Sequence, residues 1–279
     1  MNKVLLLVIS YFVVISSAFS IQLVEIYTYD VLPPYAYKND QGELTGVYVE
    51  IVKTAVSRMP EYSLSFQVVP WARAKEFVKL GSAFAILPPY FHAHDWLTDT
   101  EPKRPYIWPY SLPLYTQQDI VLCNAKVLQQ PRNRFPEDYE GLTFVMWRGD
   151  GRADAAFEKM VKDKKIELHL VKSIEDSLKT LLFNRYDCTI TSKLPSAWYI
   201  AQLKKNSKYR LRQGIGEIEQ AAGISTNEGF LGYTDIDAEK NFPYKKDFSI
   251  KFDIEIYKMK QSGELDDIVK RFVDHKVIQ

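Results

Sequence analysis

The sequence predicts an α/β protein made of two lobes, each with a sheet covered by helices. Two observations lead to this prediction. Strand-like and helix-like segments alternate over residues 21–122, and the alternation starts again at Gly141; this order is typical of parallel sheets with helices on their faces. The chain also has 279 residues, which is enough for two lobes of ordinary domain size.

The first block opens with β-branched and aromatic residues that favour a strand. After a turn cluster, Val47, Ile51 and Ala55 share one face of a helix. Gly81 can end the second helix of this block. The expected elements are strands over residues 21–29, 64–68 and 83–87, helices over 45–59 and 71–80, and an extended segment over 111–122.

The second block repeats the order, with a tight turn at Gly149-Asp150-Gly151 before its first helix. Strands are expected over residues 142–147, 166–171 and 188–191, and helices over 153–161, 174–183, 194–203, 248–261 and 263–273. In the first of the two last helices, Ile250, Ile254 and Tyr257 form an apolar stripe, which we expect to pack on a sheet.

Residues 1–20 have the three parts of a secretory signal peptide. Lys3 precedes an apolar run over residues 4–15, and Ala18-Phe19-Ser20 fits a cleavage site. The apolar run is shorter than the roughly 20 residues that a membrane-spanning helix needs. The alternatives are an uncleaved anchor or a buried helix. We expect cleavage after residue 20 and a periplasmic protein.

Composition excludes several classes of function. The 36 Lys and Arg balance the 35 Asp and Glu, whereas a nucleic-acid-binding protein should carry a basic excess. Neither GxGxxG nor GxxxxGK[ST] occurs, so no nucleotide cofactor is predicted. His92, His94 and Asp95 could bind zinc only with a further ligand, and two ordinary histidines in a loop are the better interpretation. Cys123 and Cys188 could form a disulfide outside the cytoplasm, or remain as two buried thiols.

Six segments, in this order, resemble the extracellular solute-binding proteins of family 3, which serve amino-acid ABC importers. The similarity runs over nearly the whole chain after residue 20. The matching segments are residues 32–35 (LPPY), 42–52 (GELTGVYVEIV), 80–86 (LGSAFAI), 139–145 (YEGLTFV), 182–190 (LFNRYDCTI) and 259–268 (MKQSGELDDI).

The resemblance implies the type II periplasmic-binding-protein fold, with a ligand cleft between lobes joined by two crossing strands. The first lobe would comprise residues 21–118 and 220–279, and the second residues 119–219. The strands would cross near residues 119–122 and 219–224. Such lobes close over a ligand by hinge motion.

The residues that bind an amino acid in this family are replaced in this sequence. An arginine is expected in a T-x-x-R pattern after the strand at residues 83–87, where it would bind the α-carboxylate. That pattern is absent, and Trp96 stands near the position. The acid expected for the α-amino group corresponds to Ser192, and the family's acid at the strand entry is replaced by Phe84. The departures put an ordinary amino acid in doubt as the ligand.

Other side chains could replace this grip. Arg73 begins a helix that borders the cleft in the family, and Arg148 and Arg152 flank the turn before a helix N-terminus, where anions bind. Each could instead be a solvated or ion-paired surface arginine. Tyr35, Trp71, Tyr90 and Trp96 are expected to face the cleft, as are Tyr29 and Phe91, although at least half of these aromatic residues should serve core packing.

The resemblance therefore implies a monomeric, non-catalytic solute-binding protein, without cofactor or metal, that takes a small polar or amino-acid-like ligand to an inner-membrane ABC permease. One alternative is a sensor that signals to a separate membrane partner. Another is a periplasmic dehydratase on the same fold, for which Glu50, Glu76, His92 and His94 are candidate acids or bases.

Overall fold

The computed structural model describes residues 21–148, 152–206 and 216–273. The expected signal peptide and the expected turn at Gly149-Asp150-Gly151 lie outside these ranges. Within them, no helix combines the length and the apolar character that crossing a membrane would require.

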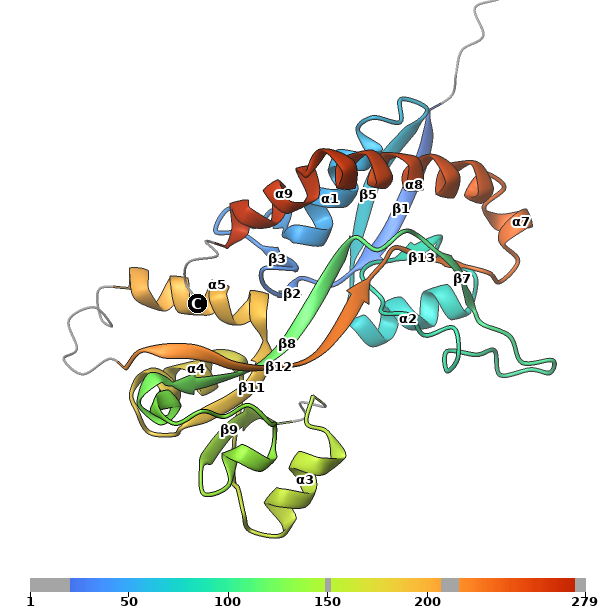
Figure 1. The fold of residues 1–279 in the computed structure, drawn as a ribbon. Helices are drawn as coiled ribbons and strands as arrows, with labels where there is room; N and C mark the ends of the chain where they lie inside the picture. The colour runs from blue at the N-terminus through green and yellow to red at the C-terminus, as the bar shows by residue number, and fades with distance from the viewer. Residues whose placement is uncertain (1–20, 149–151, 207–215, 274–279) are drawn as a thin grey trace, which may run out of the picture.

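The first lobe contains a five-stranded mixed sheet (Figure 1). Its strand order is β5 (Tyr62–Val68), β1 (Gln22–Thr28), β6 (Ala85–Ile86), β13 (Gly232–Thr234) and β7 (Ile107–Tyr110). The helices of this lobe are α1 (Val47–Val56), α2 (Trp71–Lys79), α7 (Ala238–Asn241), α8 (Lys245–Ser262) and α9 (Glu264–Phe272). A small sheet of β2 (Val31–Leu32), β3 (Ala36–Lys38) and β4 (Leu44–Thr45) leads into α1.

The second lobe repeats the arrangement with another five-stranded sheet. Its strand order is β10 (Glu167–Val171), β9 (Thr143–Trp147), β11 (Cys188–Ser192), β8 (Tyr115–Asn124) and β12 (Ile218–Gly229). Its helical segments are η1 (Ala125–Gln129), η2 (Glu137–Tyr139), α3 (Ala155–Lys162), α4 (Ile174–Leu182) and α5 (Lys193–Lys205). The strands and helices predicted for both blocks are confirmed, with shifts at their ends.

The long strands β8 and β12 run between the two lobes (Figure 1). They are antiparallel and paired from Tyr115 opposite Gly229 to Asn124 opposite Ile218. The prediction of parallel sheets is therefore wrong in part. Strands β1, β5 and β6 are parallel, as are β9, β10 and β11, but a chain that leaves a lobe and returns adds antiparallel strands to each sheet.

The expectation for α8 is also wrong. Ile250, Ile254 and Tyr257 lie on its exposed face, whereas Phe248 and Phe252 are fully buried. The helix carries two apolar stripes, and the one with the larger aromatic side chains packs on the first sheet. Phe248 contacts Phe84, whose ring centroid is 5.3 Å away. Phe84 thus belongs to the core of the first lobe.

Cys123 and Cys188 form a disulfide, which decides between the alternatives left open by the sequence. The two residues lie opposite each other on the antiparallel strands β8 and β11. The bond therefore ties β8, which leads out of the second lobe, to β11 at the centre of that lobe's sheet.

Candidate functional site

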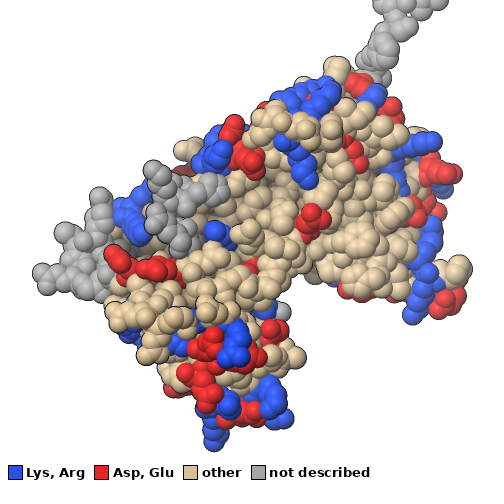
Figure 2. Space-filling view, in the orientation of Figure 1, with Lys and Arg blue, Asp and Glu red and all other residues tan. Residues whose placement is uncertain are grey.

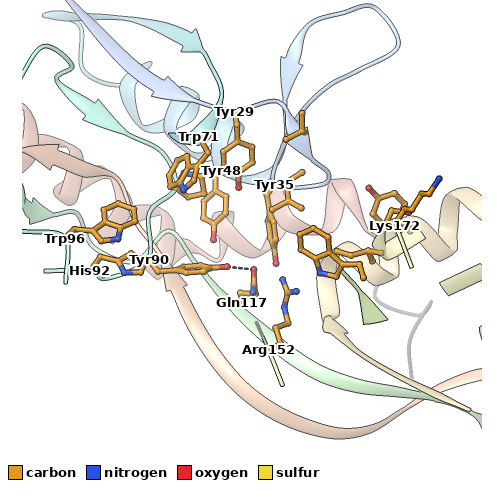
Figure 3. A pocket seen from close by; sticks show the side chains of 17 residues that line it. Tyr29, Tyr35, Tyr48, Trp71, Tyr90, His92, Trp96, Gln117, Arg152 and Lys172 are labelled. Carbon is orange, nitrogen blue, oxygen red and sulfur yellow. Dashed lines mark hydrogen bonds between the residues drawn. The ribbon is translucent and has the colours of Figure 1, made fainter. Parts of the chain in front are cut away.

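A cavity of about 490 Å³ lies between the lobes (Figure 3). Residues from the ends of strands and the starts of helices form its wall, which is the usual place for a ligand on α/β sheets. The first lobe and β8 contribute Tyr29, Val31, Leu32, Tyr35, Tyr48, Trp71, Pro88, Tyr90, His92, Trp96 and Gln117. The second lobe contributes Trp147, Arg152, Lys172, Ser173, Ile174 and Tyr199.

Aromatic rings form much of the wall on the first lobe. Tyr29 follows β1 and Trp71 begins α2, and their rings meet edge to face with centroids 5.3 Å apart. Trp96 lies 6.4 Å from Trp71 by the same measure and stacks on His92 at 4.2 Å. The ammonium group of Lys75 lies 4.3 Å from the centroid of the Trp96 ring, on a side that borders a second cavity. The contacts hold Trp96 in place as a flat surface.

Two tyrosine hydroxyls in this wall are buried without a hydrogen-bond partner. The residues are Tyr35 and Tyr48, each 2% exposed. Burial, together with nearby tyrosines, holds the pKa of both phenols well above the ordinary value. The indole Nε1 of Trp147 is likewise buried and unpartnered. Because an unpaired buried polar group is costly, such groups beside a cavity indicate hydrogen-bonding capacity that a ligand could use.

Asp119, on β8, is the acceptor of a buried hydrogen-bond network next to this cavity. Ser192 Oγ donates to Asp119 Oδ1 at 2.8 Å, and Arg152 Nε donates to the same oxygen at 3.0 Å. Gln117 Nε2 also donates to Oδ1, at 3.1 Å, and Ser225 Oγ donates to Oδ2 at 3.0 Å. The carboxylate is 3% exposed, so its charge is balanced by Arg152 and by these donors rather than by water.

The network reaches the first lobe through Tyr90. Its hydroxyl donates to Gln117 Oε1 at 2.8 Å (Figure 3). Burial raises the pKa of Tyr90, and the positive charge of Arg152 opposes the rise in part. A chain of polar contacts therefore runs from Tyr90, through Gln117 and Asp119, to Arg152 in the second lobe.

The charged groups in the wall are basic. Arg152 and Lys172 line the cavity, and none of the wall residues in the described part of the chain is an aspartate or glutamate. Asp119 instead borders an adjoining hollow of about 360 Å³, together with Ser225 and Asn227. The cavity therefore offers hydrogen-bond donors and positive charge, surrounded by aromatic surface.

The structure brings five of the eight candidate ligand-binding residues to the cavity: Tyr35, Trp71, Tyr90, Trp96 and Arg152. Arg73 is exposed on α2, because two residues along a helix from Trp71 is a turn of about 200°. Arg148 is exposed after β9. Ser192 is buried behind the wall, where it contacts Asp119. Neither Phe91 nor any of these three lines the cavity.

Sequence reasoning missed several wall residues. Tyr48 falls within the helix expected over residues 45–59 and Trp147 ends the strand expected over residues 142–147, and neither pattern pointed to a cavity. Gln117 in the wall and Asp119 next to it carried a usable signal, because they are polar residues at strand spacing just before the apolar run IVLC. Lys172 carried no such signal. For the histidine loop, no group of three potential metal ligands occurs in the described ranges.

No family model matches the sequence, and no curated protein matches it either. Solved structures do match. Substrate-binding domain 2 of Lactococcus lactis GlnP, in an open conformation, is 14% identical, with 91% of this chain and 96% of that chain covered and a TM-score of 0.64. The probable amino-acid ABC transporter extracellular-binding protein YtmK of Bacillus subtilis is 13% identical, with 92% and 99% covered and a TM-score of 0.65.

A histidine kinase sensor domain with similarity to periplasmic binding proteins also matches. It is 14% identical, with 91% of this chain and 97% of that chain covered and a TM-score of 0.59. Identities this low are informative about the fold alone, and all three comparisons extend over both lobes. The chain therefore has the two-lobed fold of periplasmic binding proteins.

Proposed function

We propose that this protein is a solute-binding protein that captures a small molecule between its lobes and delivers it to an ABC permease of the inner membrane. The observation that carries the proposal is the cavity, which takes its wall from both lobes and is bordered by Tyr35 and Tyr48, whose hydroxyls are buried without a partner. A ligand that reached both lobes would satisfy such groups and favour the closed arrangement.

The moving bodies would be residues 21–118 with 220–279, and residues 119–219. Strands β8 and β12 would act as the hinge, because they alone of the described strands pair with each other from one lobe to the other. Closure would bury the ligand from two sides, which is how a pre-formed site holds a small molecule tightly.

The proposed location is the periplasm, after removal of residues 1–20. The Cys123–Cys188 disulfide supports an oxidising compartment. Acidic and basic side chains alternate on the face drawn in Figure 2, without the basic stripe expected for a nucleic-acid partner. We propose a monomer that meets its permease as a separate partner.

The proposed role is binding without catalysis. The solved structures reported above are described as binding proteins or a sensor domain. Of the candidate acids and bases, Glu50 bonds to Lys53 away from the cavity, and His92 in the wall pairs with Asp95. A ligand should be recovered chemically unchanged after incubation with the protein.

Sensing is a second candidate, supported by the similarity to a histidine kinase sensor domain. The site would be the same in both cases, and the partner would differ. Co-purification of a permease component favours transport, whereas co-purification of a receptor kinase favours sensing.

The test is thermal unfolding of residues 21–279 against a library of amino acids, organic acids, amines, sugars and short peptides. A ligand at 100 times its dissociation constant should add about 2.7 kcal/mol to the free energy of unfolding. Small-angle scattering should show a smaller radius of gyration with the same ligand, because the lobes close.

Two variants localise the effect. Trp71→Ala should lower the ligand-induced stabilisation by about 1 kcal/mol or more, since a buried anchor in a binding site contributes more than about 1 kcal/mol. Trp108→Ala is the control, because Trp108 is half exposed on β7 and outside the cavity. An equal loss in both variants, or a ligand that binds without closure, would contradict the proposed function.

A further inference from the structure

The cavity wall has a chemical bias that restricts the kind of ligand it can take. An amino acid needs a negatively charged or strongly accepting group for its ammonium, and the described wall contains no aspartate or glutamate. The nearest buried carboxylate, Asp119, accepts hydrogen bonds from Gln117, Arg152, Ser192 and Ser225. An ammonium that reached Asp119 would have to replace one of these donors.

Several polar groups of the wall are hydrogen-bond donors. Arg152, Lys172 and the Trp147 indole can only donate hydrogen bonds, and Trp147 Nε1 is buried without a partner. The Tyr35 hydroxyl can donate or accept, but burial keeps its pKa well above the ordinary value, so it keeps its proton. Figure 3 shows the Tyr35 hydroxyl and the Arg152 side chain directed toward each other. A carboxylate between them would accept from both.

The charged side chains next to the cavity also favour an anionic ligand. Arg152 is paired with Asp119 through its Nε, and the guanidinium has further N–H groups that can serve a second acceptor. Lys172 forms no ion pair with any residue that the structure describes, and it borders the cavity just before α4. The wall also includes the aromatic surface of Tyr29, Trp71 and Trp96, which suits a flat apolar body.

We propose that the ligand is an organic acid with a flat, apolar body and no ammonium group, whose carboxylate is held by Arg152 and Tyr35 and whose body lies against Trp71 and Trp96. The inference rests on the proposed function, because it specifies the ligand class of the same cleft. It also explains why the positions that grip an amino acid hold Trp96 and Ser192 here.

Matched compounds test this class directly. Isothermal titration calorimetry is done with indole-3-propionate, tryptophan and tryptamine, which share the indole, and with 3-phenylpropionate, phenylalanine and phenethylamine, which share the phenyl ring. The inference predicts that at least one acid binds, and that it binds at least tenfold more tightly than the amino acid and the amine of its set.

Variants then locate the carboxylate. Tyr35→Phe should weaken the acid at least fivefold, whereas Tyr233→Phe should leave it unchanged, since Tyr233 also has a buried unpartnered hydroxyl but lies outside the cavity. Lys172→Met should weaken binding and Lys172→Arg should restore it. Lys246→Met, at an exposed position outside the cavity, is the control for loss of a positive charge.

The outcomes separate this inference from the proposed function. If tryptophan, phenylalanine or either amine binds as tightly as its acid, the inference is wrong and the capture of a solute still stands. If none of the six compounds binds, the inference is wrong, and the library screen decides the proposed function independently. If the acid binds and Tyr35→Phe and Tyr233→Phe behave alike, the assigned position of the carboxylate is wrong.

Discussion

Asp119 is 3% exposed, and side chains from β8, β11, β12 and the segment before α3 donate hydrogen bonds to its carboxylate. It thereby fixes the side chain of Arg152 next to the cavity. A buried charge of this kind is tolerated only while its partners are present. At the scale of single residues, the cleft therefore depends on a carboxylate that does not itself line the main cavity.

Asp119→Asn tests this dependence. The substitution keeps the shape but removes the negative charge and turns an acceptor into a donor, so the Arg152 charge loses its buried partner. We expect the free energy of unfolding to fall by about 3 kcal/mol, measured by urea unfolding.

The control is Asp267→Asn, which removes an exposed carboxylate that pairs with Lys270 at 3.0 Å. A surface pair of this kind contributes less than about 1 kcal/mol. Equal effects of the two substitutions would mean that the Asp119 network adds nothing beyond a surface ion pair.

At the scale of elements, β12 depends on close packing at one of its glycines. A side chain at Gly229 would overlap the hydroxyl and ring of Tyr48, whereas Gly223, on the same strand, has nothing within 4 Å of the position of a Cβ. The absence of a side chain at residue 229 lets α1 approach the strand that joins the lobes.

Gly229→Ala should therefore destabilise the protein by about 1–3 kcal/mol, the range for an overpacked core. Gly223→Ala should change the free energy of unfolding by less than about 0.5 kcal/mol. Both are measured by urea unfolding, and equal values would show that Tyr48 can move aside without cost.

The disulfide joins a different pair of elements, β8 and β11. It closes a loop with a sequence separation of 65 residues, for which the chain-entropy relation gives about 4 kcal/mol of stabilisation. We expect reduction to lower the free energy of unfolding by up to this amount. A double variant with Cys123→Ala and Cys188→Ala should match the reduced protein and be insensitive to reductant; a double variant as stable as the oxidised protein would contradict the prediction.

At the scale of the whole molecule, buried tyrosines occur both in the cores of the lobes and next to the cleft. Burial raises the pKa of Tyr106, Tyr115 and Tyr244 to about 12, and that of Tyr35 and Tyr48 further. The folded state therefore favours the protonated phenols more than the unfolded chain does, whose tyrosines ionise near pH 10.

A group with a raised pKa in the folded state contributes stability that is complete below its unfolded pKa and is lost as pH rises through its folded pKa. We expect the free energy of unfolding to decline from about pH 10 to pH 12. Absorbance titration at alkaline pH should show a first group of tyrosines that ionises reversibly and a second that ionises with unfolding. A single transition for all tyrosines, as in guanidinium chloride, would contradict this.

Much of the fold could be predicted from the sequence because its elements are locally encoded. The helix over Val47–Val56 and the strand over Thr143–Trp147 follow from the spacing of their apolar residues. The candidate site was predictable where an aromatic residue follows a strand or begins a helix, as with Trp71. It was not predictable for Tyr48 or Trp147, because apolar spacing does not distinguish a side chain in the core from one that borders a cavity.

The sequence by itself determined the two α/β blocks and their order, since hydrophobic periodicity and turn residues act over a few neighbours. Only the tertiary structure decided which stripe of α8 is buried, that Cys123 meets Cys188, and that Arg152, rather than Arg73 or Arg148, borders the cavity. Each of these outcomes depends on contacts between residues that are distant in the chain. Such contacts are set by how the sheets pack and where the strands cross.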